Sequence, residues 1–169
     1  NTPQLQPKST FHNFCTNQSE QTVVLGCYHG GQNGIFVLDV TDPRLTGIEQ
    51  VTAAHEMLHA AYDRLSTHDR QQVDGWLQDY YAHDLTDVTI KAQITSYQKS
   101  EPKDIVNEMH SILGTEVADL PPSLENYYRQ YFTDRSKVTA CYAQYESEFT
   151  SRQQQIAADD AQLATLKAQ

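Results

Sequence analysis

The chain has 169 residues, a formal net charge of −10 at pH 7 and a sequence pI near 5.0. This length suits one domain with a hydrophobic core of ordinary size. The acidic balance, with Lys and Arg scattered and not clustered, argues against nucleic acid or an anionic membrane surface as a partner. No apolar run approaches the roughly 20 residues of a membrane-spanning helix, so we expect no membrane insertion by this segment.

The N-terminal region contains two of the three cysteines of the chain. Cys15 and Cys27 flank a polar, turn-rich stretch (16–21), and a disulfide between them would hold a weakly structured N-terminus in place. We predict this bridge, which implies an extracytoplasmic setting; reduced thiols in a cytosolic protein are the alternative. A structural zinc on Cys ligands is disfavoured because the chain has no CxxC pair. The start at Asn1 without Met predicts a processed or truncated product that has lost any export signal or anchor.

Two short strands are predicted near the N-terminus. Residues 1–10 are rich in Pro and Gln and predict an extended arm. The runs 22–28 and 35–40 are rich in β-branched and aromatic residues, which favour strands. Residues 30–34 (Gly-Gly-Gln-Asn-Gly) supply the positive-φ positions that a hairpin turn requires. We therefore expect one antiparallel hairpin, which 41–44 terminates.

Helices dominate the rest of the chain. Residues 46–49 (Thr-Gly-Ile-Glu) have the pattern of a capping box, in which the Thr hydroxyl and the Glu carboxylate satisfy free N–H groups at a helix start. Apolar residues then recur with a helical period up to Leu65, and Ser66 to Asp69 can cap the next helix. Further helices are predicted at about 68–83, at 87–99, from a cap at Ser100 to a stop at Gly114, and from 121–123 onward.

Residues 55–59 read His-Glu-Met-Leu-His, an HExxH motif in the middle of the first long helix. Residues four apart lie on one helix face, so His55 and His59 can both bind one metal ion, whereas Glu56, about 100° around the helix, flanks the metal. A zinc hydrolase needs such a set: two neutral nitrogen ligands and a base beside the activated water. The alternatives are a chance match and a pair of core histidines satisfied by hydrogen bonds.

A catalytic zinc site needs a third protein ligand, and residues 107–116 are the best source. HExxH followed by a helix that bears Asn-Glu-x-x-Ser resembles the thermolysin-like, or gluzincin, zinc peptidases. The resemblance implies that Glu108 is the third ligand. Glu116 and His110 remain alternatives. Glu116 faces roughly the same way as Glu108 if the helix continues past Gly114, whereas His110 lies about 200° around the helix from Glu108.

A second resemblance is closer. The runs 52–60 and 110–116 are similar to a group of bacterial exported or membrane-anchored proteins classed as metallopeptidases, and the similarity extends from about Gly26 to Arg135. Thermolysin-like enzymes place an Asp one turn after the third ligand, where this chain has Ile112. Hydrogen-bonding support for a ligand His must then come from another side chain, and Glu116 and Asp63 are the candidates.

The implied chemistry is hydrolysis of a peptide bond with Zn²⁺ as the cofactor. Glu56 would act as general base on the metal-activated water and then pass the proton to the leaving amine. His110, Tyr127 and Tyr128 are the candidates for a donor to the oxyanion. By resemblance, the strand 35–40 would pair with an extended peptide or protein substrate through backbone hydrogen bonds.

The C-terminal segment 138–169 has a different character. A set of positions spaced alternately three and four residues apart runs along it, and this is the spacing of the interface positions, or seam, of a coiled-coil heptad. The segment is also rich in Ala and Gln. This pattern predicts a long helix that forms a coiled coil with a partner or a second copy of the chain, or docks along the domain. The seam consists of Tyr142, Tyr145, Phe149, Arg152, Ile156, Asp159, Leu163 and Leu166.

The sequence and the resemblance together predict an α+β, mainly α fold. A zincin-like metallopeptidase domain at 1–135 would carry the small antiparallel hairpin, and a long C-terminal helix would follow at 136–169. The expected function is that of a zinc-dependent endopeptidase outside the cytoplasm, secreted or membrane-anchored in the full-length protein. One alternative is a catalytically weak or inactive zincin-like binding or assembly module with a C-terminal coiled coil. Another treats HExxH as accidental in a helical interaction protein.

Overall fold

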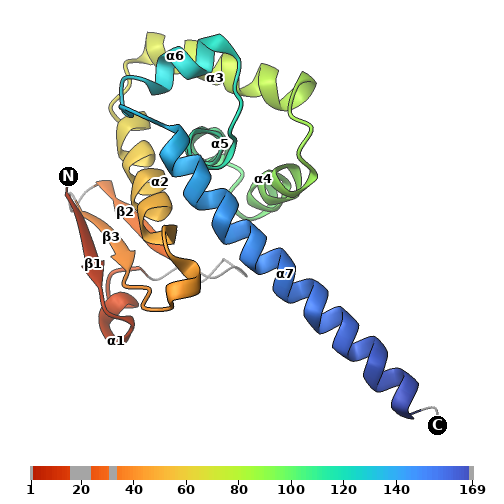
Figure 1. Cartoon of the computed structure of the whole chain (residues 1–169). Coiled ribbons are helices and arrows are strands. Elements are labelled where there is room, and N and C mark those ends of the chain that lie inside the picture. Colours follow the sequence, from red (N-terminus) through yellow and green to blue (C-terminus); the bar gives the residue numbers. More distant parts are fainter. Residues whose placement is uncertain (1, 16–23, 31–33, 168–169) are drawn as a thin grey trace.

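The structure, a computed structural model, describes residues 2–15, 24–30 and 34–167 (Figure 1). As predicted from the sequence, it is an α+β, mainly α fold with a small N-terminal sheet and a long C-terminal helix. The strands are β1 (Pro3–Gln6), β2 (Gly26–His29) and β3 (Gly34–Leu38), and the helices are α1 (Lys8–Phe11), a 3-10 turn (Pro43–Leu45), α2 (Ile48–Tyr62), α3 (Thr67–His83), α4 (Val88–Ser100), α5 (Ile105–Glu116), α6 (Pro122–Tyr128) and α7 (Ser136–Lys167).

The sheet has three strands in the order β1-β3-β2. β2 and β3 pair antiparallel, with Gly26 opposite Val37, which confirms the predicted hairpin; residues 31–33 of its turn lie outside the described residues. The N-terminal arm is more ordered than predicted, because β1 pairs in parallel with β3 and α1 follows it. β3 is therefore the central strand, which explains why its residues Ile35 to Val37 are buried.

The predicted disulfide between Cys15 and Cys27 is present, with the two Cα atoms 5.6 Å apart. It links the segment after α1 to β2, beside a small cluster in which Phe11 and Cys15 pack against Phe36. The bridge therefore fixes β2 to the N-terminal segment without depending on a large apolar core. Cys141, on α7, is a free thiol of intermediate burial.

The predicted capping box at the start of α2 is wrong. The N-cap is Gly47, whose φ of 96° lies in the left-handed region, and no side chain caps the helix. The Thr46 hydroxyl donates instead to the Pro43 carbonyl at 2.6 Å. The Glu49 carboxylate accepts a hydrogen bond from the Val40 N–H at 2.7 Å. Glu49 thus ties the start of α2 to the segment that follows β3.

The predicted limits of the α5 helix are also wrong. Ser100 is the last residue of α4, and α5 continues past Gly114 to Glu116. A Cβ at Gly114 would lie 2.5 Å from Leu58 Cδ1 and 2.7 Å from Tyr128 Cε1. Gly114 therefore permits close packing near the C-terminal end of the helix, and the two residues that follow bring Glu116 Oε1 to 4.0 Å from His55 Nδ1 on α2.

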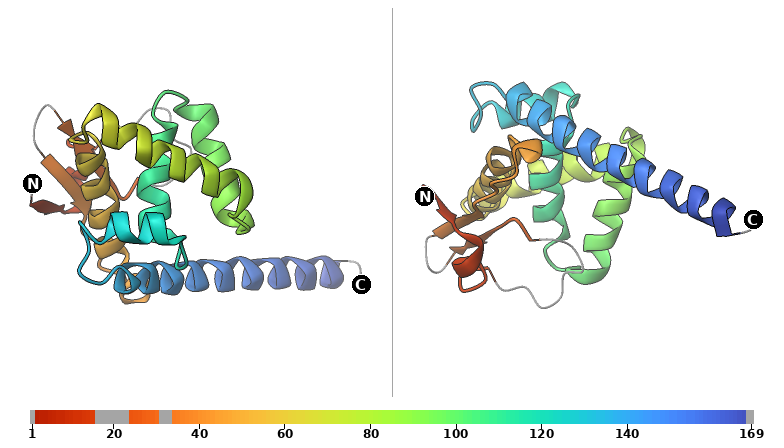
Figure 2. Two further views of the ribbon diagram at one scale, coloured as in Figure 1. Left: turned by 90° about the horizontal axis from the view of Figure 1, so that it is seen from above. Right: turned by 60° about the horizontal axis from the view of Figure 1, so that its bottom comes forward.

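α2 lies at the centre of the molecule. The sheet packs on one of its sides and α5 on another, with α3 and α6 above and α4 beside α5 (Figures 1 and 2). The first part of α7 packs on α2 and α5, and the rest of this helix projects away from the domain. The α2–α5 contact is held by side chains with 0% exposure, namely Leu58, Ile112 and Leu113.

Candidate metal centre

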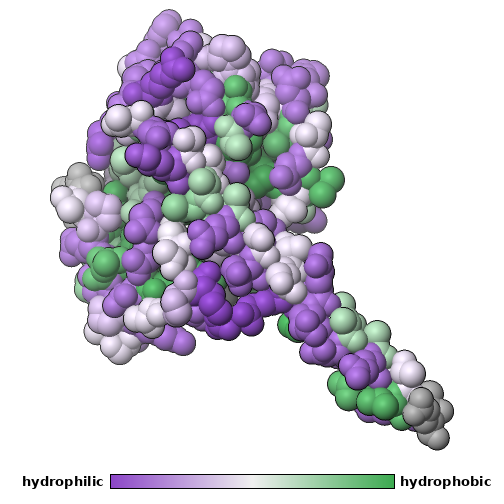
Figure 3. Space-filling model, viewed as in Figure 1, coloured by the Kyte–Doolittle hydropathy of each residue, from purple (hydrophilic) through white to green (hydrophobic). Residues whose placement is uncertain are grey.

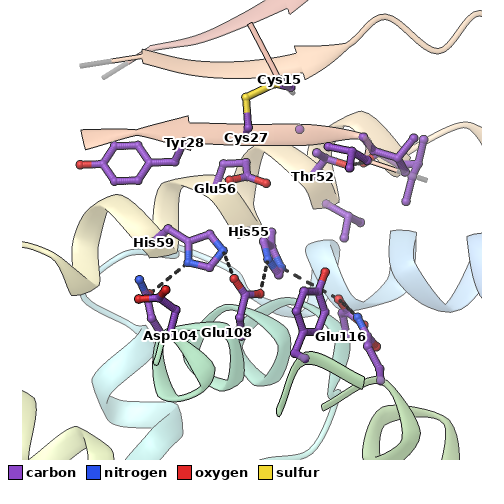
Figure 4. Close-up of a pocket in the computed structure, with 18 of the residues that line it drawn as sticks. Cys15, Cys27, Tyr28, Thr52, His55, Glu56, His59, Asp104, Glu108 and Glu116 are labelled. Atoms are coloured by element: carbon purple, nitrogen blue, oxygen red, sulfur yellow. Dashed lines mark hydrogen bonds and ion pairs between the residues drawn. A yellow bond between two sulfur atoms is a disulfide. The ribbon is translucent and has the colours of Figure 1, made fainter. Parts of the chain in front are cut away.

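α2 and α5 bring three candidate metal ligands together. His55 and His59 lie one turn apart on α2, and Glu108 faces them from α5 (Figure 4). The Glu108 Oε2 atom is 3.7 Å from His55 Nε2, and its Oε1 atom is 3.5 Å from His59 Nε2. One ligand atom from each residue lies within 4.8 Å of the other two. This group can hold a metal ion, and it contains the predicted ligand set.

The donor types and spacings suit a small tetrahedral ion. With bonds of about 2.0–2.1 Å, two ligand atoms of a tetrahedral zinc site are about 3.3 Å apart. The carboxylate-to-imidazole distances of 3.5 and 3.7 Å, each to a different Glu108 oxygen, are near that value, and the three ligand atoms as a group lie within 4.8 Å of one another. Two imidazoles and one carboxylate also leave a fourth position for water or substrate, as in catalytic zinc sites. The group thus has the composition of an open metal site.

Asn107 orients one of the two histidines. Its side-chain oxygen lies 3.0 Å from His59 Nδ1. An amide oxygen only accepts hydrogen bonds, so Nδ1 is the donor and Nε2, on the side of Glu108, is the nitrogen left to bind a metal ion. The sequence contained this signal, because Asn107 immediately precedes Glu108 in the Asn-Glu-x-x-Ser motif, but no role was predicted for the residue.

Glu116 lies behind the other histidine. Its Oε1 atom is 4.0 Å from His55 Nδ1, and it accepts a hydrogen bond from Gln93 Nε2 at 3.3 Å. Glu116 therefore lies on the side of the imidazole away from Glu108, outside the group of His55, His59 and Glu108, and its predicted support of a ligand His stays a prediction. Asp63, the other candidate for support, does not line the cavity.

The charges of the site are strongly coupled. Burial disfavours a charged His55, but the carboxylates of Glu108, Glu56 and Glu116 outweigh it and raise the pKa of His55 to about 9. Burial alone would raise the pKa of Glu108, but the ion pair with His55 and the positive charge of His59 outweigh burial and lower this pKa below its usual range. The carboxylates of the site therefore favour a positive charge on His55, and the imidazoles favour a negative charge on Glu108.

Glu56 shares the cavity with the three ligands but is not one of them. Glu56 is buried, with 8% of the residue exposed, and its carboxylate lies on the β2 side of the histidine pair (Figure 4). Burial raises the pKa of Glu56, although His55 and His59 oppose the shift. The cavity has a volume of about 470 Å³, and β2, α2, α4, α5 and α7 all contribute to its walls. It is large enough for several residues of a peptide.

β2 forms the wall of the cavity above Glu56. A Cβ at Gly26 would lie 2.5 Å from Thr52 Cγ2 and 3.1 Å from Glu56 Cγ, so only a glycine allows the strand this close to α2. The Leu25 carbonyl accepts from the Leu38 N–H at 2.8 Å. Because backbone groups alternate along an antiparallel strand, Gly26 and Tyr28 direct their N–H and C=O groups away from β3.

This topology corrects the predicted substrate strand. The strand 35–40 was expected to present its edge above the metal helix, but β3 is paired on both sides and has no free edge. The edge strand beside the cavity is β2, whose Gly26 to His29 segment lines it.

The predicted oxyanion donors lie elsewhere. His110, Tyr127 and Tyr128 are all buried and none of them lines the cavity. His110 Nε2 is 2.9 Å from the Tyr127 hydroxyl, and the Tyr128 hydroxyl donates to the His110 carbonyl at 2.7 Å. Burial lowers the pKa of His110 to about 3, so its imidazole is neutral. These residues pack α5 against α6, and the structure does not bring them to the cavity beside the candidate metal ligands.

No protein-family model, curated protein sequence or solved structure matches this chain. Among the described residues, no helix is both long and apolar enough to cross a membrane. The disulfide fits an extracytoplasmic location.

Proposed function

We propose that this protein is a zinc-dependent peptidase of the gluzincin type. The observation that carries the proposal is the convergence of His55, His59 and Glu108 in one cavity with Glu56 beside them. Two imidazoles and a carboxylate form the ligand set of known zinc peptidases, and they favour zinc over the oxygen-preferring ions magnesium and calcium. A purely structural zinc site would instead be closed by a fourth protein ligand.

Each residue of the site has a distinct task in this proposal. A bound zinc ion would polarise the carbonyl of the scissile peptide bond and lower the pKa of the attacking water. Glu56 accepts a proton from that water, whose oxygen bonds to the carbonyl carbon, and delivers the proton to the leaving nitrogen as the C–N bond breaks. The raised pKa of Glu56 suits a base that must also release its proton. Asn107 and Glu116 keep the two imidazoles in position.

The substrate proposed is an extended polypeptide that pairs with β2. The outward N–H and C=O groups of Gly26 and Tyr28 lie on the edge of the sheet that borders the cavity. An added strand would place its backbone over Glu56 and the ligand histidines. The disulfide at Cys27 holds this strand to the N-terminal segment and favours an enzyme that works outside the cytoplasm.

A peptide-cleavage assay with zinc analysis tests the proposal. The wild-type chain, loaded with one equivalent of zinc, is incubated with a diverse peptide library, and cleavage is followed by mass spectrometry. We expect Glu56→Gln to retain zinc and to lose cleavage, because the amide cannot accept the proton from water. Glu148→Gln is the matched control, since Glu148 lies on α7 and does not line the cavity. It should cleave like the wild type.

Two outcomes would contradict the proposal. If neither wild type nor Glu56→Gln cleaves any peptide while both bind zinc, the site belongs to a binding module that retains the metal. If the wild type binds no zinc, the HExxH motif has no metal function. A Gly26→Val variant adds a further check, because its side chain would displace β2 from Thr52. It should weaken cleavage and leave zinc binding intact.

A further inference from the structure

An apolar stripe on α7 begins in the domain and continues beyond it. Tyr142 and Tyr145 face the body of the protein, where both line the cavity of the candidate metal centre. The Phe149 ring stacks on Tyr145 with centroids 6.3 Å apart. Ile156 and Leu163 continue the same seam at heptad spacing. The face that packs on the domain therefore extends outward along the helix.

The outer part of this stripe is uncovered. Every residue from 149 to 167 is exposed, and the outer half of α7 projects from the domain as an isolated rod (Figures 1 and 3). Phe149, Ile156, Leu163 and Leu166 are each 50–62% exposed and account for most of the exposed large apolar side chains of the described chain. A lone helix of this kind gains no stability from tertiary packing in water. The stripe is therefore suited to a partner helix.

The polar residues of the seam select the direction of that partner. In a parallel, in-register pair, Arg152 would face Arg152 and Asp159 would face Asp159, so like charges would meet at two layers. In an antiparallel pair, Phe149 faces Leu166, Ile156 faces Asp159, and Arg152 faces Leu163. Arg152 then lies about four residues, or ~6 Å along the axis, from Asp159 of the other helix, within reach of its long side chain.

The overall charge favours the same arrangement. The segment 149–167 contains two cations, Arg152 and Lys167, and two anions, Asp159 and Asp160, and is neutral. The formal charge of −10 therefore resides on the rest of the chain. An antiparallel pair places the two acidic bodies at opposite ends of a rod of ~28 Å, several Debye lengths apart at physiological salt, whereas a parallel pair would place them side by side.

We propose that the projecting half of α7 is a self-association surface that binds a second copy of this chain in antiparallel orientation. The heptad seam supplies an apolar Phe149–Leu166 layer at each end of the pair. In the layers between, Ile156 faces Asp159 and Leu163 faces Arg152, and two symmetric Arg152–Asp159 pairs fix the register. The inference is independent of the chemistry of the metal centre.

Charge exchange tests both the partner and its direction. Sedimentation equilibrium is measured on the full chain and on Arg152→Asp, Asp159→Arg and the double exchange. We expect each single exchange to weaken dimerisation about tenfold, because two attractive pairs become repulsive, and the double exchange to restore it to within about twofold. Ala161→Arg is the control for Asp159→Arg: it lies about 200° around the helix from Asp159 and should dimerise like the wild type.

The outcomes distinguish the two orientations. Rescue by the double exchange supports the antiparallel pair. In a parallel homodimer the double exchange would leave Asp facing Asp at position 152 and Arg facing Arg at position 159, so it would create no attractive pair. A wild-type chain that stays monomeric at every concentration up to about 1 mM (a bound of about −4 kcal/mol) would overturn the proposal. A dimer that the double exchange fails to rescue would overturn it as well.

Discussion

Two sides of α5 carry polar residues, and one of them borders the cavity of the candidate metal centre. On one side, Asn107, Glu108 and Glu116 face the histidines of α2. On the other, His110 has 0% exposure and is hydrogen-bonded to Tyr127 in the core. The same kinds of side chain thus serve as candidate ligands in one place and as packing groups in the other. What separates the two sides is the presence of carboxylates and an adjoining cavity.

The imidazoles of His55 and His110 also differ in the direction in which their surroundings shift the pKa. Burial disfavours the charged form of both His55 and His110. Carboxylates beside His55 reverse the effect and raise its pKa to about 9, whereas His110 has no acidic partner and its pKa falls to about 3. Of these two histidines, only His55 has surroundings that stabilise a positive charge, whether from a proton or from a metal ion. Four experiments test this contrast.

The largest effect is expected from removing the ligand carboxylate. Glu108→Gln should lower the affinity for zinc by more than about a hundredfold, because one of three protein ligands is lost. Glu116→Gln, the matched variant behind His55, should lower it by about ten- to a hundredfold. Competition with a chromophoric chelator measures both. A larger loss for Glu116→Gln than for Glu108→Gln would reverse the assignment of the third ligand.

The close packing of α5 against α2 and α6 is tested at Gly114. Gly114→Ala should lower the free energy of unfolding by about 1–3 kcal/mol, because its Cβ would meet Leu58 and Tyr128 and force the helices apart. Gly75→Ala is the matched control, because a Cβ at Gly75, inside α3, would meet nothing within 4 Å besides its chain neighbours and the backbone of its own helix. It should raise stability by about 0.5–1 kcal/mol. Urea denaturation measures both, and equal effects would contradict close packing at Gly114.

Zinc binding should be linked to pH. With a pKa of about 9, His55 is protonated at pH 7 in the metal-free protein, and the metal must displace that proton. We expect release of about one proton per ion and an affinity that rises about tenfold per pH unit below the pKa. Calorimetry in buffers of different protonation enthalpy counts the protons. An affinity that stays flat between about pH 6 and pH 8 would contradict the coupling to the carboxylates.

The smallest effect is expected at Tyr127. Tyr127→Phe removes the hydroxyl that bonds His110 and should cost about 1 kcal/mol of stability. Zinc affinity and any peptide cleavage should not change, because Tyr127 does not line the cavity. Thermal unfolding and the cleavage assay give the two readouts. A large fall in kcat with unchanged stability would return Tyr127 to the role of oxyanion donor.

The sequence was sufficient where local periodicity determined the outcome. The HExxH spacing places His55 and His59 on one face of α2 whatever surrounds the helix. Non-local contacts decided the rest. Gly114 has the usual signature of a helix stop, yet it stays helical because Leu58 packs against it, and Glu116 reaches His55 for that reason. The pairing of β1 with β3, which moved the free sheet edge to β2, likewise has no local signal.

The decisive test of the metal centre is an anomalous-scattering map from crystals of the zinc-loaded protein, recorded at the zinc absorption edge. We expect one strong peak about 2.0–2.2 Å from His55 Nε2, from His59 Nε2 and from a Glu108 oxygen, with Glu116 outside bonding distance. A map without a peak between α2 and α5, or with a peak bound by Glu116 in place of Glu108, would contradict the proposed site.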